Sequence, residues 1–319
     1  MAGEAVELQL LVSARTPGPG PLMRLDLTRT DGGELPPWTP GSHLGVEVSG
    51  VGWRYYSLCG PLGDRTRYHI AVQHEPTGRG GSAAVHRWTA GALVRATAPR
   101  NHFHLQLQAR RHVLVAGGIG LTPMVPMVEW CESRGLPWEL HFGVRSEERR
   151  YFPEVLDRHY RHGRVYVRMD SRGERIDCAA LLAAAMPGTH VYCCGPRGLM
   201  DSMRSLGTAH PAVPIHFEAF EAEPAQDAAA NASFDVVCFD SGLRLTVLPD
   251  QTMLDALEGA GIAWPYSCRE GICGTCELEV IAGEPDHRDA VLSAGERASS
   301  RKLMPCVSRA RSHEIVVRC

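Results

Sequence analysis

Four of the eleven cysteines in this 319-residue chain lie in its last fifth, and their spacing strongly limits how that region can fold. Cys268, Cys273 and Cys276 follow the pattern C-x4-C-x2-C, and Cys306 comes after a long gap. Four thiolates at this spacing bind the two irons of a [2Fe–2S] cluster. Structural zinc is the alternative, but zinc ligands usually come as two short pairs, whereas here three cysteines share one loop. The spacing therefore predicts an iron–sulfur site on these four residues.

The loop that carries the first three cysteines is rich in small residues. Gly271, Gly274 and Thr275 leave room for a tight turn and for backbone N–H groups to approach the sulfurs. A cluster of this kind exchanges one electron at a time, so this region is predicted to move single electrons. The remaining cysteines are scattered or lie in apolar segments, where buried thiols are expected: Cys59, Cys131, Cys178, Cys193, Cys194, Cys238 and Cys319.

Composition and charge exclude several classes of partner. The net charge is −3, so neither nucleic acid nor an anionic membrane is expected to bind. No apolar run approaches the roughly 18 residues of a membrane-spanning helix. The first residues, MAGEAVELQLLVSAR, lack the basic start and apolar stretch of a secretory signal. We therefore predict a cytoplasmic protein, in which disulfides are rare.

Short strand candidates separated by Gly- and Pro-rich turns fill residues 1–107. They are VELQLLVSA, MRLDLTR, HLGVEVS, WRYYSLCG and RYHIAVQHE. Short strands at even spacing favour an antiparallel barrel or sandwich.

The pattern changes in residues 108–222, where strands alternate with helices. The strands HVLVAGG, WELHFGV, RVYVRM and THVYCCG are each followed by a helix-like stretch, among them YFPEVLDRHYRHG. This alternation predicts an α/β domain with a parallel sheet covered on both faces. Residues 223–232 are rich in Ala and polar residues and are predicted to be a linker. A third domain, 233–319, begins with a hairpin and a short helix before the cysteines.

The segment YSCREGICGTCELEVIAGEPDHRDAVLSAGERASSRKLMPCVSRA resembles the C-terminal ferredoxin of the phthalate dioxygenase reductase family. The match continues past the cysteines, through GEPDHRD and the CxSRA ending. The resemblance implies three domains: an antiparallel β-barrel that binds flavin, an α/β parallel-sheet domain that binds NAD, and an α+β β-grasp [2Fe–2S] ferredoxin. It also implies FMN rather than FAD, which the sequence alone does not exclude.

The flavin is predicted to lie against the run R-x-Y-S in WRYYSLCG. In reductases of this kind, Arg54 would pair with a flavin phosphate, Tyr56 would stack on the ring system, and the Ser57 hydroxyl would approach flavin N5. Without the resemblance, such a run is more often simply a strand.

A phosphate site is predicted nearby in GRGGSAAVHRW. Gly80, Gly81 and Ser82 stand at the start of a predicted helix, where backbone N–H groups suit an anion. The strand IAVQHE resembles the family's second flavin-contacting segment, which implies contacts from Ala71, Val72 and Gln73. Lysine is common in the family where Gln73 stands.

The nicotinamide nucleotide is predicted to bind at AGGIGLTPM, which follows a strand and opens a helix. This is not the usual G-x-G-x-x-G fingerprint, and a plain glycine-rich turn is the alternative. It resembles the version in ferredoxin reductases, where Gly117, Gly118 and Gly120 let the pyrophosphate reach backbone amides. Thr122 would then lie near the nicotinamide, with Pro123 beside it in the motif.

A companion motif, CCGPRGLM, ends the last long parallel strand at the edge where ligands bind in such sheets. The resemblance implies that Cys194, with Gly195 and Pro196, borders the region of hydride transfer. Cys193 is expected to be an ordinary buried thiol. Ser57, Thr122 and Cys194 are thus the predicted catalytic residues.

Two further assignments rest on the resemblance. HFEAFEA matches the family's F-E-x-F ending, which makes Phe220 a lid over the flavin, although a core Phe at a strand end is the alternative. Arg145, Ser146 and Arg149 follow WELHFGV and could bind a 2′-phosphate. Many family members with such residues use NADH, and NADH is the prediction for this chain.

Together the motifs predict an NADH-dependent oxidoreductase. Nicotinamide gives up two electrons together and the cluster accepts one at a time, and a flavin can do both. The resemblance implies a monomer that passes electrons through FMN and the cluster, in a transient complex, to a Rieske-type terminal oxygenase, either a ring hydroxylase or a demethylase. An electron-carrier module with inactive reductase domains and a reductase for a P450 partner are the alternatives. Acidic residues around the cluster either meet a basic docking patch or form a solvated surface: Glu270, Glu277, Glu279, Glu284 and Asp286.

Overall fold

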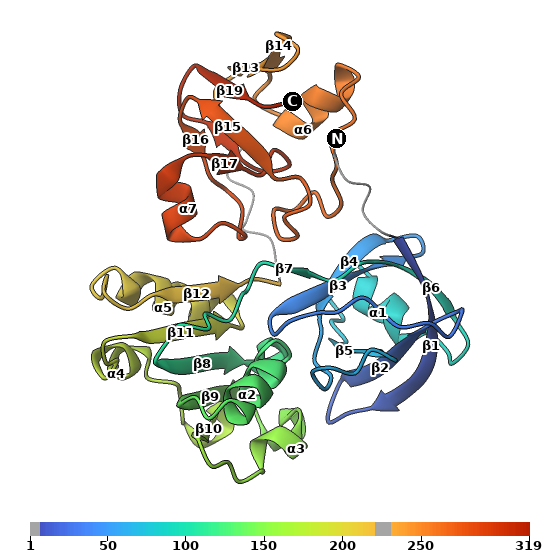
Figure 1. Cartoon of the computed structure of the whole chain (residues 1–319), viewed down its shortest axis with the longest axis vertical. Helices are drawn as coiled ribbons and strands as arrows, with labels where there is room; N and C mark the ends of the chain where they lie inside the picture. The colour runs from blue at the N-terminus through green and yellow to red at the C-terminus, as the bar shows by residue number, and fades with distance from the viewer. Residues whose placement is uncertain (1–6, 221–230) are drawn as a thin grey trace. The chain divides into compact units, whose positions relative to one another are not determined.

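The computed structural model describes residues 7–220 and 231–319 (Figure 1). The chain forms two compact units, one ending at Glu218 and one running from Ala219 to Cys319. Most of the predicted linker, 223–232, lies outside the described residues, and the predicted domain boundaries stay predictions. None of the helices in these two described ranges has the length and apolar character needed to cross a membrane.

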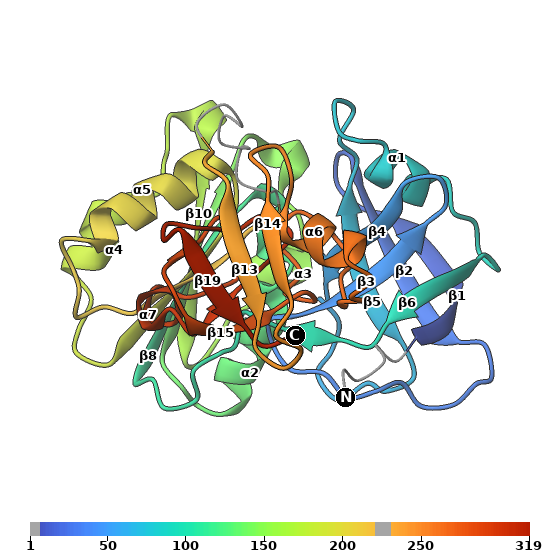
Figure 2. The same ribbon diagram turned by 90° about the horizontal axis from the view of Figure 1, so that it is seen from above.

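The first part of the larger unit is a nearly closed antiparallel barrel. Its strands follow the order β4-β3-β6-β1-β2-β5, with β7 paired to β3, and a bridge between Leu58 and Ile70 connects the two ends of this order. Figure 2 shows these strands curving around one another, with the short helix α1 (Gly81–His86) at one end. The strands are β1 (Glu7–Pro17), β2 (Leu22–Arg29), β3 (Ser42–Val48), β4 (Gly52–Ser57), β5 (Tyr68–Gln73), β6 (Leu93–Thr97) and β7 (Arg100–Asn101).

Alternation of side chains builds the core of the barrel. Leu8, Leu10 and Val12 of β1 are buried while their neighbours in the strand are more exposed. Leu25 and Leu27 of β2 enter the same apolar cluster. A period of two residues is what a strand with one buried face requires. The predicted barrel is confirmed.

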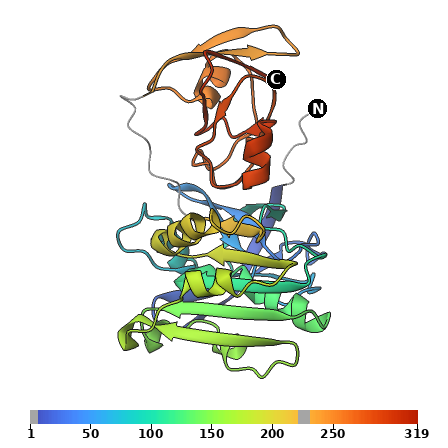
Figure 3. The same cartoon turned by 90° about the vertical axis from the view of Figure 1, so that its left-hand side faces the viewer.

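The second part of the larger unit is a parallel sheet in the order β10-β9-β8-β11-β12 (Figure 3). Helices α2 and α3 lie on the face toward the barrel, and α4 and α5 lie on the other face (Figures 1 and 2). The predicted parallel sheet with two covered faces is therefore confirmed. Its elements are β8 (Arg111–Gly117), α2 (Met124–Ser133), β9 (Trp138–Val144), α3 (Pro153–Leu156), β10 (Gly163–Met169), α4 (Cys178–Ala183), β11 (Thr189–Cys194), α5 (Arg197–Gly207) and β12 (Ile215–Glu218).

One apolar cluster joins the barrel to the parallel sheet. Leu22 and Phe103 from the barrel side pack with Met127 of α2, Phe142 of β9 and Tyr151. Burial of large side chains across this boundary contributes on the order of 2 kcal/mol for each. The two parts therefore hold their motifs in a fixed relation, as a shared site between them requires.

The smaller unit is a β-grasp with a mixed sheet in the order β14-β13-β19-β15-β17 and a two-stranded pair, β16-β18. Helix α6 begins with a capping box between Thr252 and Asp255, which satisfies backbone donors at its start. Val236, Leu257 and Ile315 lie in its apolar core. The elements are β13 (Phe234–Cys238), β14 (Arg244–Val247), α6 (Met253–Gly259), β15 (Leu278–Ala282), β16 (Pro285–Asp286), α7 (Ala294–Ser299), β17 (Lys302–Leu303), β18 (Arg309–Ala310) and β19 (Glu314–Val317).

Candidate functional site

The four cysteines predicted to bind iron come together in the smaller unit. Cys268, Cys273 and Cys276 lie on the loop between α6 and β15, and Cys306 lies between β17 and β18. The Sγ atoms of Cys276 and Cys306 are 3.3 Å apart, and the Cys268 thiol contacts those of Cys273 and Cys306. Within the described residues, no three His, Cys, Asp or Glu side chains are placed to hold one metal ion together. The thiols pair as Cys268 with Cys273 and Cys276 with Cys306, which suits a group with two irons.

Donors near the sulfurs also fit a cluster. The backbone N–H of Glu270 lies 3.3 Å from Cys268 Sγ, and the Thr275 hydroxyl lies 3.3 Å from Cys273 Sγ. Such donors stabilise thiolates that carry the charge of a cluster. Gly271 has φ +69, and a Cβ there would lie 2.6 Å from the Val307 side chain. The loop needs glycine at this position because both its backbone angle and its neighbours exclude a side chain.

A second strained residue in the loop is held by α6. Arg269 has φ +55, in the left-handed region that only glycine adopts at little cost. Its guanidinium donates to Asp255 at 2.7 Å and to Glu258, and it lies over the Tyr266 ring. These contacts offset the strain and fix the start of the cluster loop.

In the larger unit, the two halves of the predicted flavin phosphate site lie together. A Cβ on Gly81 would lie 2.7 Å from Arg54 Nε, so the guanidinium rests directly on the glycine backbone. Gly80 has φ +81 and open space in front of its Cα. A positive charge beside exposed N–H groups fits one phosphate. The Ser82 hydroxyl, in contrast, accepts a hydrogen bond from the Glu75 N–H at 3.0 Å.

Ser57, at the end of β4, contacts the parallel sheet. Its hydroxyl donates to Glu218 Oε2 at 3.1 Å, and Glu218 lies opposite Cys194 in the register of β11 and β12. Burial raises the pKa of the Glu218 carboxyl to about 8. Burial, and next the Glu218 charge, raises the pKa of the Cys194 thiol well above its usual value. The structure thus brings two predicted catalytic residues to opposite sides of one buried carboxyl.

The two predicted nicotinamide motifs touch each other at the carboxyl edge of the sheet. A Cβ on Gly120 would lie 2.3 Å from the Cys194 carbonyl oxygen, and a Cβ on Gly117 would lie 2.5 Å from Pro196 Cδ. Gly195 in turn lies against the backbone of Gly117. Glycine is required because two backbones meet here. Gly118 has φ +54 and open space beside it, which leaves the outer side of the loop accessible.

The other predicted binding residues have mixed surroundings. Thr122 is buried and donates to the Ile119 carbonyl at 3.0 Å, next to Pro123 at the start of α2. Ala71 and Val72 are buried in β5. Tyr56 packs against the barrel core, and burial raises its pKa to about 12.

Three assignments are not joined to the rest by the structure. Arg145 is exposed, and the Ser146 hydroxyl bonds to Glu148. Phe220 follows β12 and belongs to the smaller unit, so its role as a lid stays a prediction. Gln73 bonds to Tyr151 of the parallel-sheet part, with its Oε1 2.8 Å from the Tyr151 hydroxyl.

Glu218 is the residue that sequence reasoning missed. It stands inside the quoted run HFEAFEA, where the aromatic residues drew the attention. A lone Glu in a short apolar strand is itself a signal, because a carboxyl at such a position is buried only when a partner satisfies it.

Comparison with known proteins supports the picture obtained from the geometry. The model of the 2Fe-2S iron-sulfur cluster binding domain matches residues 238–311. The vanillate O-demethylase oxidoreductase of a Pseudomonas species is 39% identical, over 97% of this chain and 99% of that protein. A solved phthalate dioxygenase reductase, described as modular for electron transfer from pyridine nucleotides to [2Fe-2S], is 34% identical over 98% of both chains, with a TM-score of 0.68. The chain belongs to the phthalate dioxygenase reductase family.

A further solved structure, an intact type IV self-sufficient cytochrome P450 monooxygenase, is 38% identical with a TM-score of 0.89. It matches 98% of this chain, which spans only 41% of that protein. Membership of the phthalate dioxygenase reductase family makes the chain an oxidoreductase, the reductase component of an oxygenase system. It carries electrons from a pyridine nucleotide through flavin and a [2Fe–2S] cluster to a terminal oxygenase. The roles of single residues stay predictions.

Proposed function

We propose that this reductase takes electrons from NADH, passes them through FMN and the [2Fe–2S] cluster, and delivers them singly to a Rieske-type oxygenase. The observation that supports this most is the junction of Ser57, Glu218 and Cys194, where the barrel and the parallel sheet meet. A bound flavin supplies the conversion between two-electron and one-electron transfer. The residues of the chain bind, orient and protonate around it.

Arg54 and Gly81 support the choice of FMN. The guanidinium, the glycine backbone and the open side of Gly80 together offer one place for one phosphate. An FMN phosphate ends the molecule there, whereas FAD requires further room for a second phosphate and adenosine. The match to the phthalate dioxygenase reductase family supports the same choice.

Glu218 can hold a proton where the reaction needs one. With a pKa of about 8, the carboxyl is protonated at neutral pH. It can therefore exchange a proton with Ser57 Oγ, 3.1 Å away, without leaving a buried negative charge. Cys194 stays a neutral thiol and shapes the apolar wall opposite, because burial raises its pKa far above neutral.

NADH is favoured over NADPH by the charges after β9. Arg145 and Arg149 are cationic, but Glu147 and Glu148 stand between them, and the Ser146 hydroxyl is bonded to Glu148. Two carboxylates in one turn repel a 2′-phosphate, whereas they accept hydrogen bonds from a ribose hydroxyl.

The partner is proposed to dock transiently on a monomer. Three of the acids considered for an acidic docking surface form ion pairs within their own unit: Glu277 with Lys302, Glu279 with Arg318 and Asp286 with Arg288. Their pairing makes contact area, more than net charge, the basis of docking. All eleven cysteines are free thiols, which supports the proposed cytoplasmic location. The P450 monooxygenase match keeps a P450 partner as the second candidate.

One purification tests the proposal. The full chain is isolated without oxygen, the released flavin is identified, and kcat/KM is measured with NADH and with NADPH. One Rieske oxygenase and one P450 are then supplied and coupled turnover is compared. We expect FMN, at least a tenfold preference for NADH, roughly the value of one lost or gained charged contact, and coupling to the Rieske partner. FAD, an NADPH preference or coupling only to the P450 would contradict the corresponding part.

A further inference from the structure

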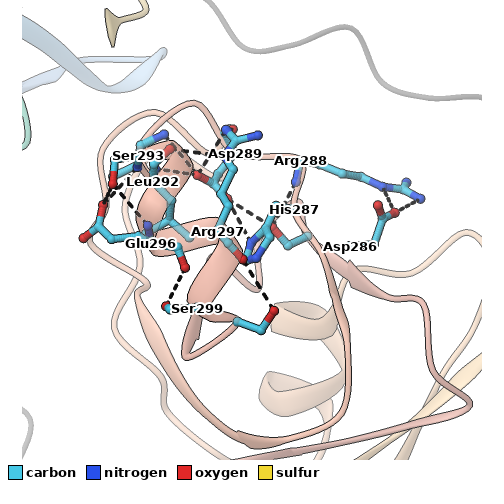
Figure 4. Close-up of polar contacts among 12 residues, drawn as sticks. Asp286, His287, Arg288, Asp289, Leu292, Ser293, Glu296, Arg297 and Ser299 are labelled. Carbon is cyan, nitrogen blue, oxygen red and sulfur yellow. Dashed lines mark hydrogen bonds and ion pairs between the residues drawn. The ribbon is translucent and has the colours of Figure 1, made fainter. Parts of the chain in front are cut away.

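The conserved-looking letters GEPDHRD and CxSRA have a structural role that cluster ligation does not use. Asp289, the last residue of the first motif, has a side chain with no exposed surface, although it is a carboxylate (Figure 4). Its Oδ2 accepts hydrogen bonds from the backbone N–H groups of Val291, at 3.1 Å, and Leu292, at 2.8 Å. A buried carboxylate is costly unless several donors satisfy it.

The same carboxylate contacts the segment that follows the fourth cysteine. Asp289 Oδ1 accepts from the Ser308 hydroxyl at 3.4 Å, and Ser308 Oγ accepts from the backbone N–H of Arg288 at 3.2 Å. Arg297 Nη2 lies 3.8 Å from Asp289 Oδ2, and the same guanidinium donates to the carbonyls of Asp289 and Leu292 (Figure 4). Ser308 is two residues beyond Cys306, so this bond fixes the position of a predicted ligand.

The network also reaches the loop with the other three cysteines. The backbone N–H of Ala290 donates to the Gly271 carbonyl at 2.9 Å, and a Cβ on Gly271 would lie 3.1 Å from the Asp289 Cα. Leu292, held by the carboxylate, packs in an apolar cluster with Cys276 and Cys306. One side chain thus connects both segments that carry ligands.

We propose that Asp289 is a positioning residue for the [2Fe–2S] cluster. Its carboxylate clamps residues 288–292 against the Gly271 loop and against Ser308, and so determines how firmly the four thiolates keep their iron. Its negative charge, only partly balanced by Arg297, also opposes the addition of an electron to a nearby anionic group. Asp289 therefore holds the reduction potential of the cluster lower than it would otherwise be.

Three variants of the full chain test this: Asp289→Asn, Ser308→Ala and, as a control, Asp250→Asn at an exposed aspartate of the same unit. The measurements are iron per chain, the rate of iron loss to a chelator, the EPR spectrum of the reduced cluster and its midpoint potential. We expect D289N to lose iron about tenfold faster or more, as for other residues that support metal ligands. Its potential moves positive and its EPR spectrum changes. S308A moves iron loss in the same direction by less, and D250N matches wild type.

Iron loss and midpoint potential of D289N and S308A equal to wild type would overturn the proposal. If D289N does not fold, S308A decides alone: an unchanged rate of iron loss contradicts the clamp. The comparison is independent of the proposed nucleotide and flavin, because the cluster can be reduced chemically. A failure of NADH to reduce the wild-type protein would remove the proposed function and leave this comparison intact.

Discussion

At the scale of single residues, burial decides which acids matter. Glu218 and Asp289 are both enclosed, but one meets a single hydroxyl and the other meets several donors. With few donors, desolvation dominates and raises the pKa of Glu218 to about 8. The two side chains therefore do different work: one stores a proton and the other acts as a fixed anchor.

The burial of Glu218 predicts how stability depends on pH. Between about pH 4.5 and pH 8 the folded state holds a proton that the unfolded state releases, so the free energy of unfolding falls as the pH rises through this window. Glu218→Gln removes this loss and is expected to stabilise the larger unit by on the order of 3 kcal/mol at pH 7 relative to pH 4.5. Melting temperatures of both proteins at pH 5 and pH 8 check it. A difference between the two proteins that is the same at both pH values would show that Glu218 titrates normally.

The sequence predicted the residues whose chemistry is written in their spacing. Cys268, Cys273 and Cys276 needed no tertiary information, because the ligand pattern is local. Glu218 and Asp289 could not be found in this way, since each depends on a partner far along the chain, Ser57 in one case and Ser308 in the other.

At the scale of elements, the pairing of β11 with β12 places three rings in a row. His190 Nδ1 lies 3.0 Å from His216 Nε2, and the His216 ring also stacks on Tyr192. Burial, and next the neighbouring histidines, lowers the pKa of His216 to about 4, and burial lowers that of His190. The pair therefore stays neutral at physiological pH and links the edge strand that carries Glu218.

Acid should loosen this pair. Between about pH 6.5 and pH 4 the unfolded state binds protons that the folded state excludes, so stability is full above this window and is lost as the pH falls through it. His216→Gln is expected to reduce that loss by roughly 1 kcal/mol at pH 5, after discounting for partial exposure of the ring. Melting curves at pH 7.5 and pH 5 give the comparison. Equal acid sensitivity in both proteins would contradict the neutral pair.

A second contact between elements joins β5 to the parallel sheet. The Tyr151 hydroxyl donates to Gln73 Oε1, and Tyr151 is fully buried. Tyr151→Phe leaves the amide oxygen without this donor and is expected to cost about 1 kcal/mol of stability. Because Gln73 is a predicted flavin contact, flavin affinity should fall as well. Thermal unfolding and flavin titration measure the two effects, and unchanged values in both would show that water replaces the bond.

Element prediction was least successful where tertiary contacts compete with a local pattern. YFPEVLDRHYRHG reads as a full helix, but α3 covers only Pro153–Leu156. The backbone N–H groups of Arg161 and His162 donate to Glu132 of α2, which draws the chain out of a helical path. Strands β8, β9 and β11 were predicted well because each is a long apolar run between glycines or turns.

At the scale of the whole molecule, the sites occupy separate compact units. The cluster thiols lie in the smaller unit, and the nucleotide and flavin motifs lie in the larger one. Electrons must therefore leave the larger unit to reach the cluster. The similarity to phthalate dioxygenase reductase over 98% of both chains supports the same modular order.

This separation predicts a selective defect. Cys273→Ser removes one of four cluster thiolates and leaves the larger unit untouched. Reduction of ferricyanide by NADH should stay within about twofold of wild type, whereas reduction of a one-electron acceptor protein should fall at least tenfold. Parallel assays on one preparation give both rates. Equal loss of the two would contradict the modular order.

The most direct test of the account is an anaerobic titration of the full chain with NADH, followed by flavin absorbance and by the EPR signal of the reduced cluster. The account predicts that NADH bleaches the flavin and that a [2Fe–2S] signal grows with it, until the cluster holds one electron. A bleached flavin with a permanently silent cluster, or no bleaching at all, would contradict the path from nicotinamide through flavin to Cys268, Cys273, Cys276 and Cys306.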